Sequence, residues 1–170
     1  MLADTLIDTP DPASAAGTST LNEPALSDRA VWLGILARSG CDLIESHLQS
    51  APALPEFTLL RGPETGMAMV RGRIGGAGAP FNLGEITISR CSIRDATGAI
   101  GHGYATGRDL AQVELIARLD AALQNPDLHA PLTTKVLAPL AARIAARRAG
   151  IEAQAQETEV KFFTLATMRS

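Results

Sequence analysis

The stretch of residues 61–109 most constrains the fold of this chain, because glycine, proline and aspartate divide it into short runs in which polar and apolar residues alternate. The runs cover residues 57–61, 67–71, 83–93 and 99–106. Such runs, separated by turn-forming residues, are typical of antiparallel strands in a meander. Residues 75–78 are rich in glycine, but they precede a strand and lack the Lys-Ser/Thr of a P-loop. The stretch therefore predicts a sheet, not a phosphate-binding loop.

Helices are predicted both before and after this stretch in the sequence. Ser27 and Asp28 can cap a first helix that ends at Gly40, and a second over residues 42–49 completes an N-terminal helical hairpin. Residues 110–124 have the strongest helical pattern, and Asp109 with Gln112 forms a capping box before them. Together with an antiparallel sheet of about four to five strands, these helices predict an α+β fold.

The C-terminal part mixes several signals. Pro126 and Pro131 predict a loop, and residues 138–158 predict an Ala- and Arg-rich helix whose arginines face solvent or a partner. Residues 160–165 have strand character, which would place Phe162 and Phe163 on opposite faces. One phenylalanine would then enter the core and the other meet a partner, with burial of both as the close alternative.

The composition indicates one globular domain with a tail. Residues 1–25 contain four acidic and no basic residues, so we expect a disordered acidic tail before a single domain over residues 26–170. Aromatic residues are only 4% of the chain, too few for a base-stacking surface, and we expect no nucleic-acid partner. With no membrane-spanning run or export signal, and with only Cys41 and Cys91 as thiols, we expect a cytoplasmic protein.

Three cationic or titratable side chains are candidates for anion or partner contacts. Arg90 shares a strand face with two isoleucines, so it either lies at the sheet rim or has a partner, which is an ion pair with Glu64 or Glu85 or a bound anion. His102 is either a hydrogen-bonded residue beside Tyr104 or a ligand contact. Arg108 lies beside a helix N-terminus, which can hold phosphate, but Asp109 competes for the same amides. For all three, the structural interpretation is favoured.

The sequence predicts neither a catalytic nor a metal site. It contains no evident nucleophile–base pair or paired-carboxylate motif, and the three histidines lack the cysteine or carboxylate spacing of a zinc site. Gly101 and Gly103 instead point to close approach by a helix on their side of a strand.

The order and spacing of several short motifs resemble those of one known family, the G subunit of the carbon–phosphorus lyase system (PhnG). The matching positions are Glu64, Thr65, Gly66, Gly75, Gly76, Gly78, Gly84, Glu85, Arg90, Gly107, Arg108 and Asp109. The resemblance runs from about Ser27 to Phe163. It departs from the family pattern where Leu110 and Gln112 replace the usual lysine and histidine before Glu114.

The resemblance implies an accessory subunit of the carbon–phosphorus lyase core complex. Such a subunit supports the formation of alpha-D-ribose 1-methylphosphonate 5-triphosphate from ATP and methylphosphonate during organophosphonate catabolism. The implied partners are the I subunit, most directly, and the H and J subunits, in a hetero-oligomer. ATP and the alkylphosphonate would be substrates of the complex, with no cofactor bound by this chain. The alternative is a free-standing anion- or nucleotide-binding protein, or a small enzyme, that uses Arg90, His102 and Arg108.

Overall fold

The computed structural model describes residues 26, 28–73 and 78–158, and these form the predicted α+β arrangement. Two helices, α1 (Arg29–Arg38) and α2 (Cys41–Leu48), precede the strands β1 (Phe57–Arg73), β2 (Pro80–Asp95) and β3 (Ile100–Thr106). Helix α3 (Leu110–Leu123) follows, and then α4 (Pro126–Leu132), the π-helix η1 (Thr133–Leu137) and α5 (Ala138–Glu157) run without a break. Each helix described here is too short or too polar to cross a bilayer.

The sheet is an antiparallel meander in the order β1-β2-β3. The predicted runs over residues 57–61 and 67–71 are parts of the single strand β1, so the described sheet has three long strands rather than four or five. Gly62 and Pro63, which lie between the two runs in sequence, fall where the β1–β2 register shifts. Because β1 is at the sheet edge, Pro63 removes no necessary ladder hydrogen bond. The strand predicted over residues 160–165, with Phe162 and Phe163, lies outside the described residues.

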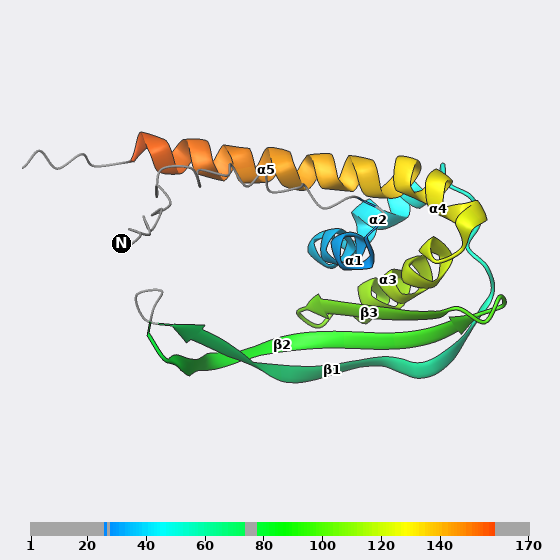
Figure 1. The fold of residues 1–170 in the computed structure, drawn as a ribbon, viewed down its shortest axis with the longest axis horizontal. Coiled ribbons are helices and arrows are strands. Elements are labelled where there is room, and N and C mark those ends of the chain that lie inside the picture. Colours follow the sequence, from blue (N-terminus) through cyan, green and yellow to red (C-terminus); the bar gives the residue numbers. More distant parts are fainter. Residues whose placement is uncertain (1–25, 27, 74–77, 159–170) are drawn as a thin grey trace, which may run out of the picture.

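One face of the sheet is covered by helices, as Figure 1 shows. Added Cβ atoms at Gly101 and Gly103 would lie 1.9 and 1.8 Å from the carbonyl oxygens of Ala117 and Val113, so α3 packs directly on the β3 backbone. The predicted small-residue side of this strand is confirmed. Helix α1 packs between α3 and α5, and the core is formed mainly by leucine, isoleucine and valine side chains of α1, α3 and η1.

A buried carboxylate ties three of these elements together. Asp120 of α3 is fully buried, and its oxygens accept hydrogen bonds from the Arg29 guanidinium (2.7 and 3.0 Å), the Trp32 indole (2.9 Å) and the His102 backbone N–H (2.8 Å). A buried charge is tolerated only when it is paired and hydrogen-bonded, and this one is both. The network fixes α1 against α3 and β3.

The loop predicted at Pro126 and Pro131 is wrong, because these residues belong to α4. Asn125 caps the helix through its side chain, and Pro126 occupies the first turn, where a missing N–H costs nothing. Pro131 lies inside the helix, directly before η1. Gly150 does not interrupt α5, which continues to Glu157.

Candidate functional site

The face of the sheet opposite α3, which we call the open face, carries most of the candidate residues. Two rows of side chains cross the three strands on this face. Glu64, Arg90 and Tyr104 form one row, and Arg61, Ser92 and His102 form the next. Paired residues of neighbouring antiparallel strands point to the same side, so these six side chains form one polar cluster.

The first row contains the ion pair that the sequence allowed. Arg90 Nε lies 2.7 Å from Glu64 Oε1, and Arg61 Nη1 lies 3.6 Å from the same oxygen. The Arg90 and Glu64 side chains remain 43% and 48% exposed, which limits such a pair to about 1 kcal/mol or less. Glu64 therefore supplies the negative charge that a bound anion would otherwise supply to Arg90.

The second row brings together two residues that sequence reasoning had not joined. The Ser92 hydroxyl and His102 Nδ1 lie 2.9 Å apart. A serine–histidine pair acts as nucleophile and base only when a third group orients the histidine. In residues 28–73 and 78–158, the His102 ring makes no other hydrogen bond, and it is exposed on the sheet surface. Sequence could have joined Ser92 and His102 only through their pairing across β2 and β3, and that pairing was known only from the structure.

Arg108 lies apart from both rows, in the turn before α3. Gly107 has φ +100°, a conformation that favours glycine, and it directs the chain from β3 into the helix. Asp109 Oδ1 then accepts the backbone N–H of Gln112 at 2.9 Å, which is the first half of the predicted capping box. Among the described residues the reciprocal bond is absent, and the Gln112 side chain instead donates to the Ser39 carbonyl oxygen. Arg108 itself is exposed, and no hydrogen bond or ion pair joins it to Arg90 or His102 among the described residues.

Several family-motif positions make hydrogen bonds that stabilise the fold of this chain. The hydroxyls of Thr65 and Ser89 lie 3.1 Å apart, and Ser89 donates to the Gly107 carbonyl oxygen at 2.9 Å. Gln112, which stands where relatives were expected to have histidine, is buried and donates to the Ser39 carbonyl oxygen at 2.6 Å. Leu110, in place of the lysine, is 41% exposed. Among the motif glycines, Gly75 and Gly76 lie outside the described residues.

Beyond β3, the sheet continues as a two-stranded extension that we call the ribbon, formed by residues 66–73 of β1 and 80–87 of β2. Figure 1 shows these ends of β1 and β2 projecting past β3 and α3. The ribbon exposes five large apolar side chains: Met67 (71%), Met69 (51%), Phe81 (39%), Leu83 (66%) and Ile86 (42%). Strand alternation places Met67 and Met69 on the side of the ribbon away from the open face and Ile86 on the side of the open face, so both sides expose apolar side chains. Exposed apolar surface of this kind is typical of a protein contact.

Gly66 and Gly84 lie in the ribbon on the side of the open face. A Cβ added to either one would meet nothing within 4 Å, and neither has a positive φ. The fold of this chain therefore does not require glycine at these two motif positions. What glycine supplies there is a bare strand backbone that another molecule can approach closely.

The described residues contain no cluster of three or more histidine, cysteine, aspartate or glutamate side chains that could hold a metal ion. Burial raises the pKa of the Cys91 thiol above its ordinary value of 9.0, and the negative charge of Glu114 adds to the shift. Burial, followed by the charge of Glu45, raises the pKa of the Cys41 thiol in the same way. A raised pKa keeps both groups as neutral thiols, which are poor nucleophiles and poor metal ligands.

A family model and a curated relative show what this chain is similar to. The family model described as "Phosphonate metabolism protein PhnG" matches residues 27–168. A protein of Rhizobium meliloti (strain 1021), named alpha-D-ribose 1-methylphosphonate 5-triphosphate synthase subunit PhnG, is 37% identical over 146 residues. The alignment covers 86% of this chain and 93% of the relative.

Proposed function

Since the chain belongs to the family of the phosphonate metabolism protein PhnG, we propose that it is an accessory subunit of the carbon–phosphorus lyase core complex. In this role it supports the formation of alpha-D-ribose 1-methylphosphonate 5-triphosphate from ATP and methylphosphonate. The name of the Rhizobium relative, a subunit of the synthase for this compound, supports the assignment because the two chains align over nearly their whole lengths.

The observation that carries the accessory role is the exposed apolar surface of the ribbon. Met67 and Leu83 are the most exposed of its large side chains, at 71% and 66%. Leaving such side chains in water costs about 25 cal/mol for each Å² of apolar area, and a partner subunit that covers them recovers this free energy. On the opposite side of the ribbon from Met67, the bare backbone at Gly66 and Gly84 allows a partner to approach the strands closely.

The proposed direct partner is the I subunit of the same complex, with the H and J subunits in the assembly. ATP and the alkylphosphonate are then substrates of the complex, and this chain binds no cofactor of its own. The polar cluster of the open face suits an interface better than a reaction centre, because Glu64 already pairs with Arg90 and the cluster is exposed to water. A cytoplasmic location fits the free thiols of Cys41 and Cys91.

Co-purification tests this proposal directly. The tagged chain is co-expressed with the I, H and J subunits, and the mass of the purified assembly is measured. We expect a stoichiometric complex with the unchanged chain. Met67→Glu combined with Leu83→Glu should reduce recovery of the I subunit at least about tenfold, because two carboxylates would be buried without partners.

Leu110→Glu is the matched control, since Leu110 is a 41% exposed leucine at the start of α3 and lies outside the ribbon. It should leave assembly unchanged. A chain that remains alone in the presence of all three subunits contradicts the accessory role and favours the free-standing alternative. Equal loss of the I subunit in the ribbon and control variants would show that the ribbon is not the docking surface.

A further inference from the structure

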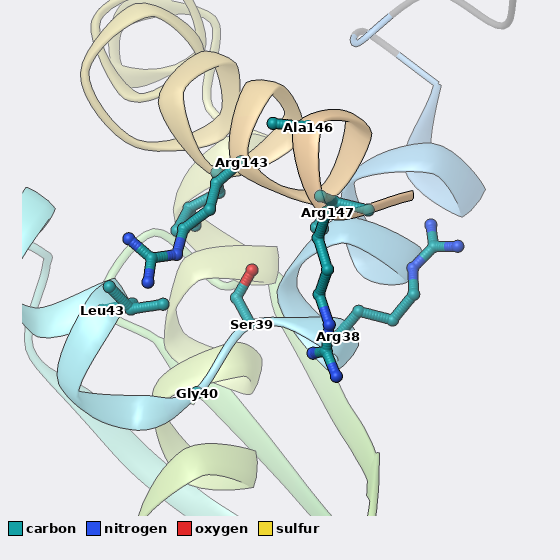
Figure 2. A pocket seen from close by; sticks show the side chains of 9 residues that line it. Arg38, Ser39, Gly40, Leu43, Arg143, Ala146 and Arg147 are labelled. Atoms are coloured by element: carbon teal, nitrogen blue, oxygen red, sulfur yellow. The ribbon is translucent and has the colours of Figure 1, made fainter. Parts of the chain in front are cut away.

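A cavity between α1, α2 and α5 is lined by three arginines that take no part in the sites described above. Arg38 is the last residue of α1, while Arg143 and Arg147 lie one turn apart on α5. The cavity has a volume of about 560 Å³. Figure 2 shows Arg143 extending from α5 beside Leu43 and Arg147 extending toward Arg38, with the Ser39–Gly40 backbone between them.

These three guanidinium groups lack compensating charge. In the part of the chain that the structure describes, none of them makes an ion pair, and Arg38 Nε donates only to the Gly34 carbonyl oxygen at 2.7 Å. Like charges around one cavity repel each other, and the repulsion falls when an anion enters. Guanidinium groups have a fixed fork of donors that matches the oxygens of phosphate.

The backbone that lines the cavity adds to its preference for anions. Gly40 is the N-cap of α2 and has no side chain to satisfy the first amides, whereas α1 and α3 are capped by the carboxylates of Asp28 and Asp109. A helix N-terminus has partial positive charge. Asp42 is in the first turn of α2 but does not line the cavity. The α2 terminus therefore adds to the field of the arginines.

A second cavity of about 610 Å³ continues this surface along α5 and shares Arg38, Ile144 and Arg147 with the first. It adds Arg148, which pairs with Glu152 at 2.9 Å, and the exposed side chain of Ile151. The combined groove thus has a strongly cationic end and an end with apolar side chains.

We propose that the groove formed by Arg38, Arg143 and Arg147 binds a polyphosphate chain. The three guanidinium groups have no acidic partner among the described residues and lie at separate points around the cavity, with Arg38 folded back toward Gly34 and Arg143 beside Leu43. Separated positive charges suit several linked phosphates better than one compact anion. Identifying the ligand as the triphosphate group of a nucleotide or of a ribose triphosphate rests on the proposed function. This site is separate from Arg90 and Arg108, the positions that the sequence suggested for anions.

Inorganic tripolyphosphate is the probe, and its binding to the intact chain is measured by calorimetry and by the shift in Tm. At a hundredfold excess over Kd, we expect Tm to rise by roughly 5 °C or more. Arg143→Gln with Arg147→Gln should weaken binding by about a hundredfold, or tenfold for each charged hydrogen-bonding group removed. Both side chains are exposed, so folding should be retained.

Arg90→Gln with Arg108→Gln removes the same charge from another surface and should leave tripolyphosphate binding within about twofold. Equal weakening in the two double variants would reveal nonspecific charge attraction and overturn the proposal. So would failure of the unchanged chain to bind tripolyphosphate. Because co-purification with the I subunit is measured separately, loss of polyphosphate binding would leave the accessory role intact.

Discussion

The β3 half of the sheet and the ribbon use glycine in opposite ways. At Gly101 and Gly103, the missing side chain allows α3 to approach so closely that any Cβ would overlap a backbone carbonyl. At Gly66 and Gly84, the missing side chain leaves open space, although these strands pair with the same antiparallel geometry. Glycine in the first region completes this chain's own packing, whereas in the second it leaves an uncovered surface. The contrast teaches that a Gly-rich sheet can carry both a core contact and a contact for another molecule.

The largest expected effect on stability comes from placing a side chain between β3 and α3. Gly103→Val places Cβ 1.8 Å from the Val113 carbonyl oxygen, and neither backbone can move without separating α3 from the sheet. We expect a loss of at least about 4 kcal/mol in unfolding free energy, measured by urea denaturation, or no folded protein. Gly84→Ala is the control from the ribbon and should change stability by less than about 1 kcal/mol. Similar losses in both variants would remove the distinction between the two regions.

A smaller effect is expected from changing the Asp120 carboxylate, which holds α1 to the β3 half of the sheet. Asp120→Asn leaves one oxygen where four donor contacts now converge, and the Arg29 charge loses its partner. We expect a loss of about 3 kcal/mol, because breaking a buried pair leaves unsatisfied groups behind. Glu152→Gln, which removes an exposed pair with Arg148, should cost less than about 0.5 kcal/mol in the same denaturation experiment. A negligible change for Asp120→Asn would mean that α1 is held by apolar packing alone.

The smallest effect concerns the Cys91 thiol, which is 1% exposed on the covered side of β2. Its pKa is raised in the folded chain, so its contribution to stability is fully present below the ordinary pKa of 9.0 and is lost as pH rises through the folded value. Stability should therefore fall as the pH is raised above about 9. Cys91→Ala should flatten this fall, as measured by denaturation at several pH values. An unchanged slope in the variant would assign the fall to other groups.

Local sequence patterns predicted much of the β3 half of the sheet and of the helix that packs on it. Gly101 and Gly103 lie on the same side of one strand, which predicted the close approach of the next helix. Asp109 directly precedes an apolar stripe, which predicted the start of that helix. The Asp120 network was missed because its partners Arg29 and Trp32 are 91 and 88 residues away in sequence. Pro126 and Pro131 misled the prediction, since proline ends many helices but is accommodated in a first turn.

The candidate site was predictable only in part. An ion pair between Arg90 and Glu64 followed from an arginine on an apolar strand face, and the structure contains it. Arg143 and Arg147 were expected to face solvent or a partner. Their position around the same cavity as Arg38 depends on the packing of α5 beside α1, which no local pattern encodes. The exposure of the ribbon also depends on where β3 ends rather than on the sequence of the ribbon itself.

The π-helix between α4 and α5 sets the angular position of the arginine groove. A π-turn holds one residue more than an α-turn, and each residue of an α-helix advances the side-chain direction by about 100°. If the same residues of Thr133–Leu137 wound as an ordinary α-helix, α5 would present Arg143 and Arg147 about 100° away from Arg38. The wider winding of this one segment thus determines whether the charge of α5 faces the groove or faces away from it.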